Sequence, residues 1–205
     1  MRVAIVIGII LLFLAWTSGS AQKTSSQSAP RKRTSSESVL GSLAAGDYRN
    51  SLFGFRYKVP YGWVDRTEQM RETSGGSDKS LVLLAAFGRP PEASGETVNS
   101  AVIITAESLS LYPQVKTAAD YFASVTDAAT KRDFKPAGEP YWYQLGTKRL
   151  VRGDFTNEVG GHAMYQSSLV TLDKGYAISF TFLEENEGEV EQLMQRLAWP
   201  GQPKK

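Results

Sequence analysis

Four strand-like segments follow one another between residues 141 and 183, and they limit the possible folds more than any other feature. The segments are Tyr141–Leu145, Arg149–Thr156, His162–Leu172 and Tyr176–Leu183. The last two are joined by Leu172-Asp173-Lys174-Gly175-Tyr176, in which Gly175 supplies the positive φ that a hairpin turn requires. Runs of strands with few helices between them are typical of an antiparallel sheet.

The first half of the chain also contains strand-like segments. Apolar and polar residues alternate through Phe53–Val59 with the period of two that indicates a half-buried strand, and Pro60 and Gly62 end it in a turn. Leu81–Phe87 is almost entirely apolar, and Ala101–Ala106 is rich in β-branched residues. The predicted order, with two helices, is β-β-β-β-α-β-β-β-β-α, and these three segments are among the four strands expected before the first helix.

Two segments have the period of a helix. Thr117 followed by Asp120 resembles a capping box, and Asn186 caps a closing helix. The apolar face of the first helix comprises Ala118, Tyr121, Phe122, Val125 and Ala129, and the stripe of the second comprises Val190, Leu193, Met194 and Leu197. The sequence therefore predicts an α+β fold, an antiparallel β-sheet sandwiched by α-helices. We expect one domain over residues 46–200, starting near Asp47, and a short tail at 201–205.

The N-terminus has the features of an export signal. Arg2 precedes an apolar run over Val3–Trp16, and Gly19 and Ala21 fit the −3 and −1 positions of a cleavage site before Gln22. The run is shorter than the roughly 20 apolar residues of a membrane-spanning helix. We therefore expect a signal peptide over residues 1–21 and a periplasmic or secreted protein, with an uncleaved membrane anchor as the alternative.

Residues 22–45 are rich in Ser, Thr, Ala and Gly, which predicts a flexible linker. The linker contains Arg31, Lys32 and Arg33, which we interpret as a solvated charge run, or as a contact with anionic lipid or a cell-wall polymer. Of the 23 basic and 21 acidic residues in the chain, 18 and 20 lie beyond Ala45. The domain is thus mildly acidic, and this balance argues against nucleic acid as its partner.

Few residues are available for catalysis. The chain has no cysteine, so thiol nucleophiles, thiolate metal sites and lipoprotein acylation are excluded. His162 is its only histidine, and no G-x-S-x-G elbow accompanies it. We interpret His162 as a structural or solvent-facing residue, with a weaker interpretation as a binding residue. No cofactor and no metal ion are expected.

Acidic residues leave one catalytic alternative open. Asp65, Glu107 and Asp154 lie near strand ends, and a pair of them facing across a cleft would suit glycoside hydrolysis. The acidic cluster over residues 184–191 lacks the spacing of a calcium loop, and the positive end of the closing helix accounts for it.

Aromatic residues are the remaining candidates for binding. Tyr61 and Trp63 flank the first turn, and Trp142 points to the opposite sheet face from its two tyrosine neighbours. Arg149 and Arg152 are expected at the rim of such a surface. Most aromatic side chains are nevertheless expected in the core.

Three segments carry a family resemblance. Residues 53–63 (Phe-Gly-Phe-Arg-Tyr-Lys-Val-Pro-Tyr-Gly-Trp), 117–122 (Thr-Ala-Ala-Asp-Tyr-Phe) and 172–177 (Leu-Asp-Lys-Gly-Tyr-Ala) resemble the opening strand, first helix and late hairpin of the PsbP-like family. This family includes the extrinsic photosystem II subunit and its bacterial relatives. The resemblance implies an antiparallel sheet sandwiched by helices and a non-catalytic accessory or assembly role. It carries over no functional residue.

These observations leave three hypotheses for function. The first is an exported, non-catalytic accessory domain that binds an envelope protein or a small ligand. The second is a hydrolase that uses carboxylates, which requires two acids in one deep pocket. The third is a carrier of lipid or another amphiphile, which requires an apolar cavity between sheet and helix.

Overall fold

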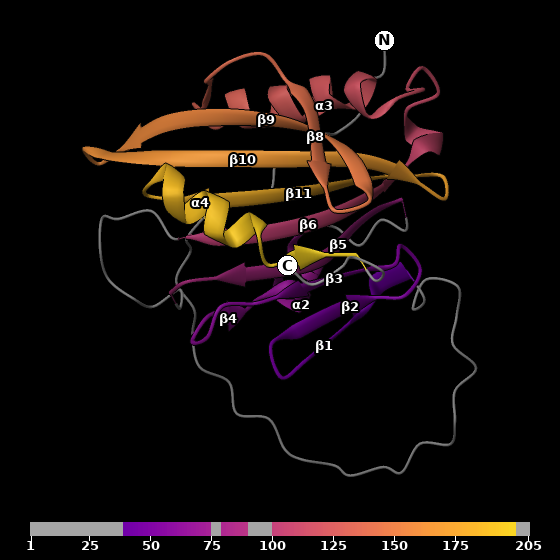
Figure 1. Cartoon of the computed structure of the whole chain (residues 1–205), viewed down its shortest axis with the longest axis horizontal. Helices are drawn as coiled ribbons and strands as arrows, with labels where there is room; N and C mark the ends of the chain where they lie inside the picture. Colours follow the sequence, from indigo (N-terminus) through magenta and orange to yellow (C-terminus); the bar gives the residue numbers. More distant parts are fainter. Residues whose placement is uncertain (1–38, 75–78, 90–99, 200–205) are drawn as a thin grey trace.

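The computed structural model describes residues 39–74, 79–89 and 100–199, and within them the chain forms two antiparallel sheets with three α-helices (Figure 1). The large sheet has the spatial order β4 (Val64–Asp65), β5 (Ser80–Phe87), β6 (Ala101–Ser108), β11 (Tyr176–Glu184), β10 (His162–Asp173), β9 (Lys148–Val159) and β7 (Lys135–Pro136), with β8 (Tyr141–Leu145) also paired to β9. The small sheet has the order β1 (Ser42–Ala44), β2 (Asp47–Asn50), β3 (Phe55–Lys58) and β12 (Leu197–Ala198). The predicted α+β class with antiparallel strands is confirmed.

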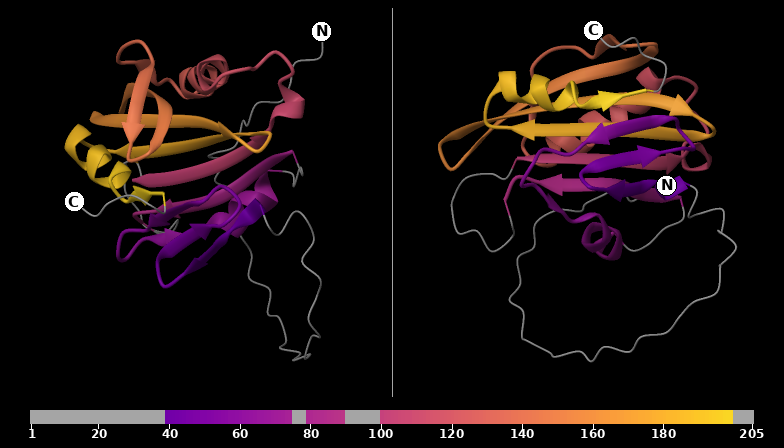
Figure 2. Two further views of the ribbon diagram at one scale, coloured as in Figure 1. Left: turned by 45° about the vertical axis from the view of Figure 1, so that its right-hand side comes forward. Right: turned by 60° about the horizontal axis from the view of Figure 1, so that its bottom comes forward.

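One face of the large sheet, here called the inner face, is covered by the small sheet and by α4 (Glu187–Met194). Figure 2 shows this layer beside the long strands. Phe55 from the small sheet packs edge-on against Phe180 of β11 at 5.1 Å, and Trp199 packs against both rings. All three side chains are buried, so the hydrophobic effect joins the two sheets here.

The opposite, outer face carries α2 (Thr67–Thr73) and α3 (Ala118–Thr130). Phe122 of α3 lies parallel to Phe155 of β9, and it approaches the backbone at Gly153. A Cβ atom at position 153 would lie 2.5 Å from the Phe122 ring, so the close contact of helix and sheet depends on glycine there.

The local signals that define the helix starts are present as predicted. The Thr117 side chain accepts a hydrogen bond from the Asp120 backbone, and Asp120 accepts one from the Thr117 backbone, which completes the capping box. Asn186 accepts a hydrogen bond from Glu189 N–H at the start of α4. In the late hairpin Lys174 and Gly175 both have positive φ, as a type I′ turn requires.

The fold differs from the sequence-based prediction at several short elements. Val39 is buried and β1 pairs with β2, so ordered structure begins before Asp47 and includes part of the expected linker over residues 22–45. Leu197, expected on the closing helix, lies in β12, because the helix ends at Met194 and the chain then pairs with β3. β4, β7 and α2 were also missed, since segments of two to seven residues show too little periodicity.

The predicted signal peptide, the residues Arg31, Lys32 and Arg33, and the tail at 201–205 lie outside the described residues. Among the helices of the described ranges, none is long and apolar enough to cross a membrane.

Candidate binding surface

The hairpin of β8 and β9 places aromatic residues at the edge of the large sheet. The strands pair from Tyr141 opposite Arg152 to Leu145 opposite Lys148, with a two-residue turn between them. In Figure 1 β8 stands at an angle to the long strands of the sheet. Tyr141 retains 46% of its exposure and Trp142 49%, which are large fractions for aromatic side chains in a strand. We call Tyr141, Trp142, Tyr143, Arg149 and Arg152 the β8 ledge.

One side of the ledge is formed by Trp142 and Arg149. The Arg149 guanidinium carbon lies 4.2 Å from the centre of the Trp142 ring, in the geometry of a cation–π contact. Both side chains are exposed, and Arg149 makes no ion pair with any residue in the described ranges. The pair therefore offers solvent a flat aromatic surface next to a guanidinium whose hydrogen-bond donors remain available to a partner.

The other side of the ledge is built around Arg152, which is only 6% exposed. Its Nε donates to Asp154 Oδ1 at 2.9 Å, and its Nη2 contacts Glu191 Oε1 of α4 at 2.5 Å and Ser167 Oγ at 3.2 Å. Ser167 also donates a hydrogen bond to Asp154. The network joins β9, β10 and α4, so it holds α4 against the sheet.

The rings of the ledge are positioned by this network. Arg152 lies 5.4 Å from the centre of the Tyr143 ring and 5.9 Å from that of Tyr141, and Tyr141 Oη donates to Asp154 Oδ2 at 3.3 Å. Burial alone would lower the pKa of Arg152, but its hydrogen bonds to Glu191 and Asp154 raise it above the ordinary arginine value. Burial also raises the pKa of Tyr141. Arg152 is thus a positively charged positioning residue at neutral pH.

The structure places Trp142, Arg149 and Arg152 in one hairpin, with Arg152 on the opposite face from the other two, and it places the other predicted binding residues elsewhere. Tyr61 is fully exposed in the turn after β3, and Trp63 is half-buried against the core. His162 is exposed and pairs with Val159, at the end of β9 far from the segment that β8 contacts. These three residues do not share a surface with the ledge.

The three carboxylates considered for hydrolysis also lie apart. Asp65 is opposite Ala86 near one end of β5, and Glu107 is opposite Ser80 at the other end. Asp154 lies on β9 and binds Arg152. Glu107 accepts hydrogen bonds from Ser80 and Tyr112 instead of facing another acid. Within the described ranges, no group of three or more His, Cys, Asp or Glu side chains is arranged to hold a metal ion.

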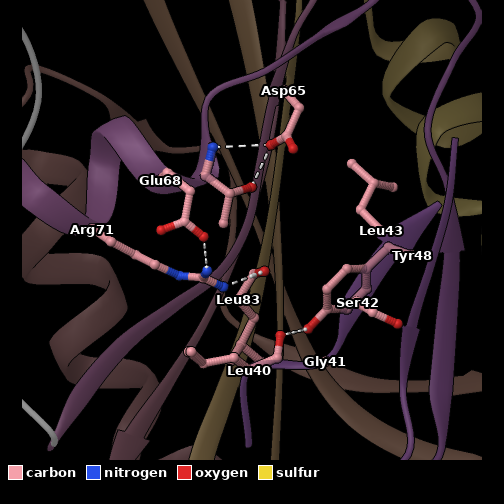
Figure 3. A pocket seen from close by; sticks show the side chains of 10 residues that line it. Leu40, Gly41, Ser42, Leu43, Tyr48, Asp65, Glu68, Arg71 and Leu83 are labelled. Carbon is pink, nitrogen blue, oxygen red and sulfur yellow. Dashed lines mark hydrogen bonds and ion pairs between the residues drawn. The ribbon is translucent and has the colours of Figure 1, made fainter. Parts of the chain in front are cut away.

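A pocket of about 220 Å³ lies between the small sheet and the β4–α2–β5 segment (Figure 3). Leu40, Leu43 and Leu83 form apolar parts of its wall, and Asp65 and Arg71 form polar parts.

The polar groups of this pocket are bound to the protein itself. Arg71 donates to Val82 O at 2.7 Å and Leu83 O at 3.2 Å and also pairs with Glu68. Asp65 accepts from the backbone and hydroxyl of Thr67, and Tyr48 donates to Leu40 O at 2.7 Å. The pocket is smaller than the roughly 300–1,000 Å³ of typical ligand sites.

Sequence reasoning missed Glu191 as a member of the ledge network and missed the pocket residues. Glu191 was assigned to the helix dipole, and nothing in the sequence indicates that α4 lies over Arg152. Residues Leu40 and Leu43 were assigned to the linker, where isolated apolar residues give no periodic signal.

Comparison with known proteins gives weak similarities only. No family model matches the chain, and no curated protein matches its sequence. Cyanobacterial PsbP (CyanoP) from Synechocystis sp. PCC 6803 aligns with a TM-score of 0.44 at 10% identity, over 78% of this chain and 98% of that one. LpqN from Mycobacterium tuberculosis, described as involved in cell envelope biogenesis, aligns with a TM-score of 0.39 at 12% identity, over 69% of this chain and 76% of LpqN.

A third structure, from Bacteroides thetaiotaomicron VPI-5482, aligns with a TM-score of 0.38 at 12% identity. The alignment covers 71% of this chain but only 45% of that structure, so this chain spans less than half of its length. Similarities at this level do not assign the chain to a family.

Proposed function

We propose that the chain is an exported, non-catalytic accessory domain that binds a protein partner through the β8 ledge. The observation that carries this proposal is the exposed Trp142 ring with the Arg149 guanidinium stacked on it at 4.2 Å. Trp, Tyr and Arg are the residue types most enriched among side chains that dominate protein interfaces. The export part of the proposal rests on the apolar run Val3–Trp16 and the small residues before Gln22.

The ledge is suited to protein contact because its support is rigid. Arg152 is bound by Asp154, Ser167 and Glu191, so the Tyr141 and Tyr143 rings beside it, on the other face of β8 from Trp142, keep their orientation before a partner arrives. A preorganised surface loses less side-chain entropy on binding than a mobile one. The flat aromatic area and the available Arg149 donors would then contribute directly to affinity.

The two alternative functions have less support from the described residues. A carrier requires an apolar cavity, whereas the pocket beside β1 is small and has polar groups in its wall. A hydrolase requires two facing carboxylates, whereas Asp154 and Glu191 are bridged by Arg152, which neutralises much of their charge. A bound amphiphile in native mass spectra of the purified protein would favour the carrier instead.

The proposal is tested by photo-crosslinking in living cells. The photoreactive residue p-benzoylphenylalanine replaces Trp142 in one variant and Tyr61 in a matched control, because both positions carry exposed aromatic residues but only the first belongs to the ledge. We expect protein adducts from position 142, in the exported fraction, and far fewer from position 61. The absence of adducts at position 142, or equal adducts at both, would contradict the proposal.

A further inference from the structure

The edge of β8 differs from the other sheet edges in the described ranges. β4, β7 and β12 have two residues each at an edge and β1 has three, whereas β8 has five. β7, which pairs with the same side of β9, consists of Lys135 and Pro136, two residue types that prevent pairing with another chain. β8 has neither a charged residue nor a proline. This edge therefore lacks the usual protection against strand addition.

The backbone of β8 can accept a further strand. Leu145 and Lys148 close a two-residue turn, and such a closing pair exchanges hydrogen bonds within the hairpin. Because hydrogen-bonded and non-bonded pairs alternate, Trp142 and Gln144 direct their N–H and C=O groups away from β9. A strand that pairs with β8 would satisfy these groups.

We propose that a second copy of this chain supplies that strand, so that two β8 strands pair antiparallel about a twofold axis through Tyr143. This inference rests on the proposed function and names the partner of the same ledge. In this register Trp142 faces Gln144 of the other copy, and Tyr141 faces its Leu145. On the axis Tyr143 faces Tyr143 of the other copy, and aromatic pairs of this kind stabilise neighbouring strands.

The charges of the ledge permit this pairing. β8 itself carries no charge, so no like charges face each other across the new strand pair. The two Arg149 residues lie on the outer β9 strands, so their backbones would be about three strand spacings, ~14 Å, apart. Each guanidinium lies against the Trp142 ring of its own copy and is exposed, so water and salt weaken the repulsion between the two charges.

Pairing through β8 produces a closed dimer and no larger assembly. A twofold contact uses the same edge of both copies and leaves no second β8 edge for growth. The opposite edge of the large sheet is β4, which has only two residues. An edge of five residues buries little area, so we expect a weak dimer whose population depends on concentration.

The experiment is sedimentation equilibrium over a range of concentrations, with the protein purified in the form that the cell exports. Three double variants at the exposed positions 142 and 144 test the register. W142K/Q144K places lysine opposite lysine and W142E/Q144E places glutamate opposite glutamate, so each alone should be monomeric. W142E/Q144K places opposite charges together in both pairs and should still dimerise. Mixing the two like-charged variants should restore a dimer that contains one copy of each.

The outcomes separate this inference from the proposed function. Dimers of the wild type that are lost in the like-charged variants and restored on mixing support pairing through β8. A wild type that is monomeric at all concentrations, or dimers that survive in W142K/Q144K, would overturn it. If the protein is monomeric while position 142 crosslinks to a different protein, the inference fails and the proposed function stands. If the protein is monomeric and position 142 yields no adduct, both fail.

Discussion

The aromatic core between the two sheets and the β8 ledge use the same kinds of residue in opposite ways. Phe55, Phe180 and Trp199 are buried, and Phe180 contacts the other two edge to face, whereas Tyr141 and Trp142 keep nearly half of their exposure. The first group stabilises the fold because its area is removed from water on folding. The exposed rings of Tyr141 and Trp142 contribute this free energy only when a partner covers them. Mutations should therefore affect stability in the core and association at the exposed residues of the ledge.

The largest loss of stability is expected in the aromatic core. Phe180→Ala removes a fully buried ring that contacts both Phe55 and Trp199, and should lower the free energy of unfolding by about 3–5 kcal/mol. Urea denaturation monitored by circular dichroism measures this change. Phe180→Leu, which leaves a smaller cavity, is the control and should cost clearly less. Equal effects would contradict the expectation that the loss grows with the size of the cavity.

The next largest effect is expected at Arg152, the buried member of the ledge. Arg152→Met leaves Asp154 and Glu191 without their cation, and should lower the free energy of unfolding by about 2–4 kcal/mol. The estimate is below that for a fully buried pair because the two carboxylates keep 32% and 38% of their side-chain exposure. Adding Glu191→Gln should recover part of the loss, since it removes one uncompensated charge. Unfolding by urea tests both variants, and a double variant less stable than Arg152→Met would contradict the role of Arg152.

A smaller effect is expected where α3 meets the outer face. Gly153→Ala places a methyl group 2.5 Å from the Phe122 ring and should destabilise the protein by about 1–3 kcal/mol through overpacking. Combining it with Phe122→Leu should cost less than the sum of the two changes, because the smaller side chain makes room for the methyl group. Thermal unfolding of the four proteins in this cycle gives the coupling, and strict additivity would argue against the contact.

The pH dependence of the free energy of unfolding tests the environment of Glu184. Burial raises the pKa of Glu184 above its ordinary value, against the hydrogen bond that Ser100 donates to it. The folded protein therefore binds this proton more tightly than the unfolded chain, and the stabilisation is complete below the ordinary glutamate pKa and is lost as pH rises through the folded value. Glu184→Gln removes this dependence. The stability of the variant relative to wild type should increase with pH, and a constant difference across pH would contradict the assignment.

The smallest change in stability is expected at the exposed part of the ledge. Trp142→Ala should alter the free energy of unfolding by no more than about 0.5 kcal/mol, because the ring lies on the surface. The same substitution should weaken dimerisation and abolish crosslinking from a probe placed at Tyr141. A large stability loss without any change in association would show that Trp142 belongs to the core and not to a binding surface.

Much of the fold was predictable because its signals are local. The boundaries of β8, the turn at Lys174 and Gly175 and the two helix caps follow from periodicity and hydrogen bonds between neighbouring residues. The pairing of β1 with β2 and of β12 with β3 was not predictable, because strands of two to four residues are selected by packing between the sheets. Of the candidate site, the opposite orientation of Trp142 and its neighbours followed from alternation along the strand. Alternation did not predict that Tyr61, Trp63 and His162 lie away from the ledge.

By itself, the sequence determined the order and type of the long elements, the absence of thiol chemistry and the alternation that turns Trp142 away from Tyr141 and Tyr143. These properties depend on the composition of the chain and on residues a few positions apart. Only the tertiary structure decided that Arg152 lies buried between Asp154 and Glu191, that a second sheet covers the inner face, and that β8 ends the large sheet without a protecting charge. These properties depend on contacts between residues far apart in the chain, whose free energy is set by packing and leaves no local pattern.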